Sequence, residues 1–182
     1  MQLFTKSHIP LFLLGLVYLF TRLYNLLLLP IFTDESIYIY WSKVIQTTHS
    51  QWGLSLTDGK PPLLTWIIAI FLQIFPSDWY LLAGRLPSVL FGLITLLGIY
   101  KLTKLLFIER VTRGGEPHGR GPLVGGHGAA EWQDPRNRAE KIALLAGVLY
   151  ILNPFSLLYD RLALFDSLLT SMTIWTVIYT IK

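Results

Sequence analysis

Two adjacent carboxylates, Asp34 and Glu35, lie at the start of a long polar-rich stretch between apolar segments, residues 33–63. At membrane depth, neighbouring carboxylates repel each other and require cations or hydrogen-bond donors close by. Lys60, at the end of the same stretch, and Arg85 could supply that charge. We therefore interpret this stretch as an active-site loop. The alternative is that the charges are only helix caps and snorkelling anchors.

The composition indicates that these charges belong to a membrane protein. Of the 182 residues, 53% are hydrophobic, 14% are aromatic and only 14% are charged, which is unusual for a soluble domain. The chain has no cysteine, which excludes disulfides, thiolate metal sites and a cysteine nucleophile. The net charge is +4, but the basic residues flank apolar segments. Positively charged loops at the cytoplasmic face explain this placement better than a nucleic-acid partner does.

Four apolar segments are long enough to cross a hydrocarbon core of about 30 Å as helices. Their sequences predict transmembrane helices at residues 9–29, 86–107, 142–159 and 162–181. We interpret the first as an uncleaved anchor that starts inside, because its end is bulky and lacks a small-residue cleavage site. The Asn153-Pro154 pair predicts a bend or an end in the third.

Two further segments are predicted to lie in the membrane interface. Residues 34–47 have the aromatic content of an interfacial helix, with Thr33 as its expected N-cap. Residues 63–75 are apolar but bracketed by prolines, and they are too short for a comfortable crossing. Both are therefore predicted to be juxtamembrane helices in the first outer loop.

An arginine-rich segment, residues 110–140, predicts a flexible cytoplasmic loop or insert, and its central part is rich in glycine. If this loop is cytoplasmic and residues 63–75 do not cross the membrane, the predicted helices cross it in alternating directions. Several charged residues then lie on the outer face. They are Asp34, Lys60, Arg85, Arg161 and Asp166.

Five short motifs carry a resemblance when they are taken in order. They are Arg22 to Pro30, Asp34-Glu35, Lys60-Pro61-Pro62-Leu63, Gly84-Arg85-Leu86-Pro87-Ser88 with Phe91-Gly92, and Arg161 to Leu164 with Asp166 to Leu169. This order resembles the N-terminal half of the GT-C glycosyltransferases, closest to bacterial relatives of protein O-mannosyltransferases and of the lipid A aminoarabinose transferase. The fold class implied is an all-α integral membrane protein with about four transmembrane and two juxtamembrane helices. Family members are longer, so we expect an N-terminal fragment, which could lack activity by itself.

The resemblance implies an enzyme that moves a sugar from a polyprenyl-phosphate carrier to a lipid, glycan or protein acceptor. It would be a multi-pass protein of the bacterial plasma membrane whose site faces outward. Asp34 matches the catalytic carboxylate, which takes a proton from the acceptor, and Glu35 completes the catalytic pair. The implied substrate-binding residues are Lys60, Arg85, Asp166, Arg22 and Arg161.

Several alternatives stay open. The sequence does not decide which cation, Lys60 or Arg85, meets the phosphate, and Asp166 could orient the acceptor or tune Asp34. No cofactor is assigned, and a divalent metal ion is left open. A different class of protein, a transporter or flippase-like subunit, would handle lipid-linked headgroups without catalysis. Transporters tend to contain internal repeats, and none is found in the sequence. A scaffold without catalysis is the third alternative.

Overall fold

The computed structural model describes residues 8–113 and 135–181. This part of the chain is helical and contains no strand, which confirms the all-α prediction. Two short 3-10 helices, Leu54–Asp58 and Ser77–Trp79, precede the third and fourth long elements. The α-helices are α1 His8–Leu23, α2 Thr33–Thr48, α3 Leu63–Ile74, α4 Tyr80–Arg113, α6 Pro135–Leu152, α7 Pro154–Tyr159 and α8 Phe165–Ile181.

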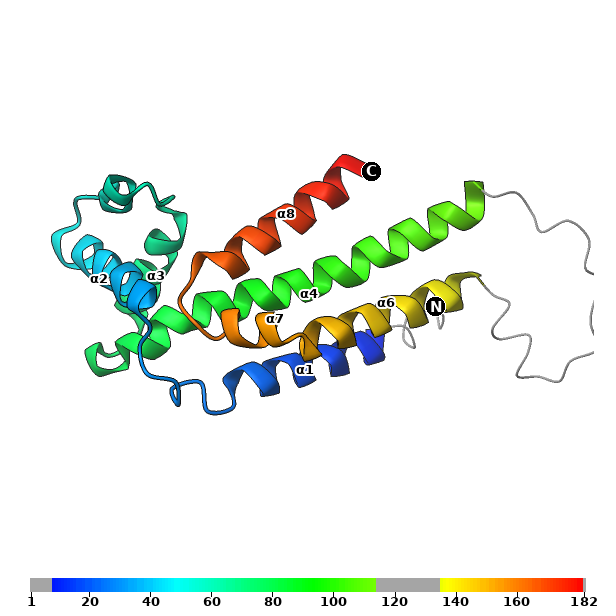
Figure 1. The fold of residues 1–182 in the computed structure, drawn as a ribbon, viewed down its shortest axis with the longest axis horizontal. Coiled ribbons are helices and arrows are strands. Elements are labelled where there is room, and N and C mark those ends of the chain that lie inside the picture. Colours follow the sequence, from blue (N-terminus) through cyan, green and yellow to red (C-terminus); the bar gives the residue numbers. More distant parts are fainter. Residues whose placement is uncertain (1–7, 114–134, 182) are drawn as a thin grey trace, which may run out of the picture.

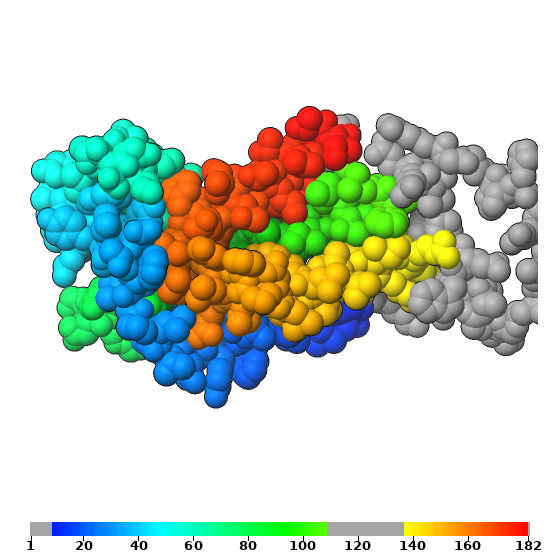
Figure 2. Space-filling view, in the orientation of Figure 1, coloured from blue at the N-terminus to red at the C-terminus, as the bar shows by residue number. Residues whose placement is uncertain are grey.

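A bundle of α1, α4, α6 and α8 runs along the length of the molecule, whereas α2 and α3 gather at one end (Figure 1). Toward that end α1 and α7 finish and α4 and α8 begin. The space-filling view shows α2 and α3 lying against the start of α8 (Figure 2). An apolar cluster holds them there, with Tyr38 and Ile39 of α2, Leu64 and Ile68 of α3, and Leu168 of α8 all buried. The segments that carry the predicted site residues therefore meet at one end.

One described helix is long and apolar enough to cross a membrane, and it spans residues Ser77–Ile108. The residues Ile9–Leu23 and Leu63–Ile74 form shorter apolar helices. The number of crossings therefore stays a prediction. The long helix is the centre of the bundle, because α1, α3, α6 and α8 all pack against it.

Several helix boundaries differ from those predicted. The first helix ends at Leu23, whereas the apolar run predicted a helix to residue 29. Thr33 was predicted to be the N-cap of the second helix, but it is the first residue of α2, and Phe32 is the N-cap. The fourth helix begins at Tyr80 and continues to Arg113, so it takes in the start of the predicted loop at residues 110–140.

The glycine-rich part of that loop lies outside the described residues, and its C-terminal flank is helical from Pro135. The predicted break at Asn153-Pro154 is confirmed, because α6 ends at Leu152 and a separate short helix, α7, begins at Pro154. The side-chain oxygen of Asn153 caps this helix by accepting a hydrogen bond of 3.0 Å from the Phe155 amide.

A glycine allows α4 to approach two buried polar side chains. A Cβ atom at Gly92 would collide with the Tyr18 hydroxyl and would lie 2.6 Å from Asp160 Cγ. Both side chains are buried, so neither can swing into solvent. We expect Gly92→Ala to lower the free energy of unfolding by about 1–3 kcal/mol through overpacking.

Denaturant unfolding of the detergent-solubilised chain would measure this loss. Gly15→Ala is the matched control, because it is also a mid-helix change and its Cβ would lie 3.8 Å from the nearest side-chain atom, of Leu93. The two variants share the gain in helix propensity, so the clash accounts for their difference. Equal stability of the two variants would contradict the proposed close approach.

Candidate active site

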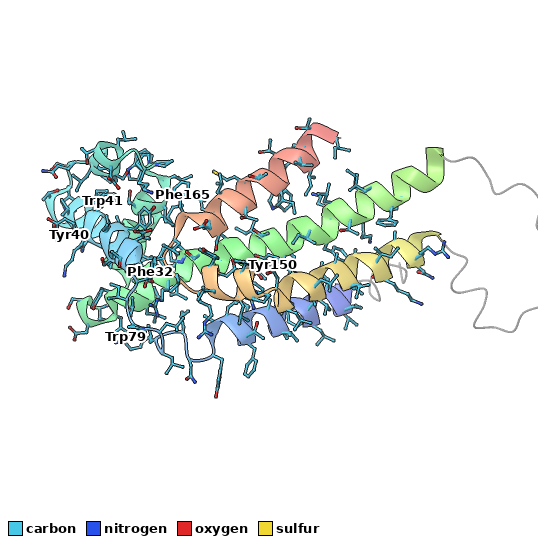
Figure 3. All side chains as sticks on the ribbon, viewed as in Figure 1. Phe32, Tyr40, Trp41, Trp79, Tyr150 and Phe165 are labelled. Carbon is cyan, nitrogen blue, oxygen red and sulfur yellow. The ribbon has the colours of Figure 1, made fainter. Side chains whose placement is uncertain are left out.

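Three of the predicted site residues, Asp34, Lys60 and Asp166, line one cavity of about 410 Å³. The remaining lining residues are Phe32, Tyr38, Pro61, Tyr159, Leu164 and Phe165. Figure 3 marks Phe32 and Phe165 where the α2 end of the molecule meets the helix bundle. Residues that are far apart in the sequence therefore place two carboxylates and an ammonium around one space.

Local structure positions each of these three side chains. Asp34 lies in the first turn of α2 and Asp166 in the first turn of α8, where the helix dipole favours negative charge. Lys60 follows Gly59, whose φ of 70° closes the turn after the 3-10 helix and favours glycine. The Lys60 amide donates a hydrogen bond of 3.0 Å to the Ser55 carbonyl. All three side chains belong to exposed residues, so a solute can reach them.

Tyr38 lines the cavity although it was not among the predicted site residues; it lies in the segment 34–47, whose aromatic content predicted an interfacial helix. Burial raises the pKa of its phenol, Lys60 partly offsets this rise, and Asp34 and Asp166 add to it. The hydroxyl therefore stays protonated at neutral pH and can both donate and accept a hydrogen bond. The described residues contain no group of three or more histidine, aspartate or glutamate side chains that could hold a metal ion.

Glu35 and Arg85 form a buried pair and are absent from the cavity lining. Both side chains are fully buried, and Arg85 Nε lies 2.7 Å from Glu35 Oε1. The Arg85 Nη2 atom donates to Glu35 Oε2 at 2.8 Å, so the contact is bidentate. The same carboxylate accepts hydrogen bonds from the amides of Ala163, at 2.9 Å, and Phe32, at 3.1 Å. Glu35 therefore joins the start of α2 to α4 and to the segment before α8.

The backbone between α1 and α2 is irregular, and two arginines hold it. Arg85 donates further hydrogen bonds to three carbonyl oxygens of this segment, and Arg161 donates to two others. The acceptors of Arg85 are Leu26, Leu29 and Pro30, and those of Arg161 are Tyr24 and Asn25. Carbonyls that lose their helical partners need other hydrogen-bond donors, so these contacts help to explain how α1 can end at Leu23 within an apolar run.

Arg22, in the last turn of α1, is also fully buried and contacts the end of α6. Its two terminal nitrogens donate to the Ile151 carbonyl at 3.1 and 3.2 Å, and Nη2 also donates to Ser156 Oγ at 3.0 Å. Its Nε atom lies 3.5 Å from Asp160 Oδ2 and makes no hydrogen bond. Charge attraction, rather than a well-formed hydrogen bond, therefore links Arg22 to Asp160.

Asp160 is a buried acid in the short connection between α7 and α8, and it was not among the predicted site residues. Its oxygens accept hydrogen bonds from Ser167 Oγ at 2.9 Å and from the Tyr150 hydroxyl at 3.0 Å. Burial raises the pKa of Asp160, while these two donors and Arg22 oppose the rise. Little in the sequence marks this acid as buried, because its enclosure depends on α4 passing closely at Gly92.

The seven predicted site residues therefore divide into two sets. Asp34, Lys60 and Asp166 surround the cavity. The other four are absent from its lining, and each of their side chains makes hydrogen bonds to other parts of the protein. They are Glu35, Arg85, Arg22 and Arg161.

This arrangement defines an all-helical protein with a membrane-length central helix and a charged cavity at one end of its bundle. Residues 59–113 match the family model for dolichyl-phosphate-mannose-protein mannosyltransferase. The match extends from the turn before Lys60 through α3 and α4, so it includes the Lys60-Pro61-Pro62 and Gly84-Arg85 motifs. It confirms the resemblance to a membrane glycosyltransferase of this type. No curated protein and no solved structure matches the chain.

Proposed function

We propose that the chain carries the catalytic cavity of a glycosyltransferase that uses a polyprenyl-phosphate sugar as donor. The observation that supports this most is the cavity shared by Asp34, Lys60 and Asp166. The family match over residues 59–113 supports the reaction class. The acceptor is a hydroxyl or amine of a lipid, glycan or protein, and the cavity opens at the outer face of a bacterial plasma membrane.

The proposed transfer needs a base and a cation. The acceptor atom attacks the anomeric carbon and gives its proton to the Asp34 carboxylate. The bond between the anomeric carbon and the phosphate oxygen breaks, and the phosphate leaves with that electron pair. The ammonium group of Lys60 stabilises the charge that develops on the phosphate. Asp166 lines the same cavity, from which it can orient the acceptor.

Hydrogen-bond capacity supports Lys60 over Arg85 as the cation that meets the phosphate. A guanidinium has five N–H donors, and Arg85 makes five hydrogen bonds inside the protein, two of them to Glu35. Lys60 belongs to an exposed residue at the cavity. We therefore assign Arg85 and Glu35 a positioning role, and Arg22 and Arg161 a role in holding the helices together.

The direct test of the proposed function is the release of polyprenyl phosphate from a labelled polyprenyl-phosphate sugar by the full-length gene product. Sugar transfer releases the lipid phosphate as the glycosylated acceptor forms. A transporter or flippase-like protein would move or bind the same lipid and leave its sugar attached. An intact donor after incubation with a binding-competent protein would therefore reject the enzymatic proposal.

The Lys60 ammonium should contribute strongly to phosphate binding. We expect Lys60→Ala to weaken the binding of polyprenyl phosphate by about 10-fold or more, because a hydrogen bond to a charged group contributes about 1.5–3 kcal/mol. Lys60→Arg should retain much of the affinity. A titration of labelled polyprenyl phosphate into nanodiscs that contain the chain would measure the difference.

Lys43→Ala is the control for this titration. Lys43 is an exposed lysine on α2 that does not line the cavity, so its loss changes the net charge equally. Equal weakening by both alanine variants would indicate a general charge effect and would argue against a phosphate contact at Lys60.

A further inference from the structure

A second cavity, of about 270 Å³, adjoins the first. It lies between the end of α6, the short helix α7 and the start of α8, and Figure 3 marks Tyr150, one of its lining residues, within the bundle. Tyr159 and Asp166 line both cavities. The two spaces are therefore neighbours, with Asp166 at their junction.

The second cavity differs from the first in its chemistry. Its lining carries hydroxyl, amide and carboxylate groups but no lysine or arginine, and Phe155 is its one residue without a polar side-chain group. The polar residues are Tyr150, Asn153, Ser156, Tyr159, Asp160, Asp166, Ser167 and Thr170. The lining offers no cation to bind a phosphate, whereas its carboxylates can accept hydrogen bonds from hydroxyl groups.

The wall of this cavity is already organised. Asp160 is held by Ser167 and Tyr150, each of which donates to a different carboxylate oxygen. Oδ1, which accepts from Ser167, has a further lone pair with which it can accept another hydrogen bond. Oδ2 also faces the Arg22 guanidinium, and the Tyr18 hydroxyl contacts the same carboxylate. Arg22 lies behind Asp160, with Nε at 3.5 Å from the carboxylate, and offsets its charge from inside the bundle. A ligand would thus meet fixed acceptors.

We propose that this second cavity binds a neutral sugar ring, while the neighbouring cavity with Lys60 takes the phosphate. This inference rests on the proposed function and names a subsite for it. The volume lies just below the range of about 300–1,000 Å³ typical of drug-sized ligands, which suits a single sugar unit. The ring belongs either to the donor or to the acceptor, and Asp166 lies where the two cavities join.

Thr170 offers a test with a matched control. Thr170 and Thr173 are exposed residues of α8, and each donates a hydrogen bond of 2.8 Å to the carbonyl four residues earlier. Only Thr170 lines the cavity. Thr170→Leu removes a hydroxyl and fills part of the space, whereas Thr173→Leu makes the same change elsewhere on the helix.

The probe is a radiolabelled methyl glycoside, either methyl α-mannoside or methyl α-glucoside, in equilibrium dialysis against the full chain in nanodiscs. We expect saturable binding of at least one of them to the wild-type chain and to Thr173→Leu, and binding at least 10-fold weaker to Thr170→Leu. Thr170→Ser should retain the binding. This last variant separates loss of the subsite from misfolding, because it keeps the hydroxyl.

Competition identifies which sugar the subsite takes. Displacement of the glycoside by a polyprenyl-phosphate sugar, but not by polyprenyl phosphate, assigns the subsite to the donor. Binding that neither lipid displaces assigns it to the acceptor. Absence of saturable glycoside binding, or equal loss in Thr170→Leu and Thr173→Leu, would overturn the sugar subsite. The proposed function fails separately, if polyprenyl phosphate does not bind or the donor is not cleaved.

Discussion

Asp34→Asn should reduce sugar transfer by the full-length gene product by about 10²–10⁴-fold, the usual contribution of a positioned general base. Asparagine has nearly the same shape but cannot take the acceptor's proton. The Asp34 side chain belongs to an exposed residue, so the replacement leaves no buried group without a partner. We therefore expect unchanged membrane insertion, unchanged unfolding and nearly unchanged donor binding, with the loss confined to turnover.

Release of labelled polyprenyl phosphate in membranes that contain the acceptor would measure this loss. Asp58→Asn is a suitable control, because Asp58 is also exposed and lies in the same polar stretch, residues 33–63, but does not line the cavity. It should retain turnover close to that of the wild type. If Asp34→Asn also retained wild-type turnover, another group would have to act as the base, and the assignment of Asp34 would fail.

The difference between Asp34 and its neighbour shows what the sequence could predict. Consecutive residues on an α-helix point about 100° apart, so Asp34 can face the cavity while Glu35 is buried. A signal for this was present. Tyr38, Ile39 and Ser42 are buried residues of α2, and they lie three, four and seven positions after Glu35. This spacing marks one helix face and would have placed Glu35 on the inner side.

The convergence of the cavity residues was predictable in outline. The lengths of the apolar segments and the charge of the loops predicted that Asp34, Lys60 and Asp166 share one end, and the three line one cavity. The early end of α1 was not predictable in the same way. It depends on carbonyl contacts from Arg85 and Arg161, and no local pattern reveals contacts between segments so distant in the sequence.

The buried pair of Arg85 and Glu35 should have the largest effect on stability. Arg85→Met leaves the Glu35 carboxylate in the interior without its cation, and we expect it to lower the free energy of unfolding by about 3–5 kcal/mol. Glu35→Gln should also destabilise, because it leaves the buried guanidinium without a counter-charge. The double variant Glu35→Gln/Arg85→Met should lose less than the sum of the two single changes, since neither charge is then left unpaired.

The same variants distinguish a positioning pair from a phosphate-binding arginine. A lysine at position 85 keeps the positive charge but cannot reproduce the bidentate contact with Glu35 or the contacts with Leu26, Leu29 and Pro30. We therefore expect Arg85→Lys to unfold at a clearly lower denaturant concentration than the wild type, whereas Lys60→Ala should unfold at nearly the wild-type concentration. An Arg85→Lys variant with wild-type stability and weakened polyprenyl-phosphate binding would show that Arg85 contacts the phosphate. In that case Arg85 Nη1 and Nη2 would have to release the backbone carbonyls and donate to the lipid phosphate instead. The segment between α1 and α2 would then have to move when the donor binds.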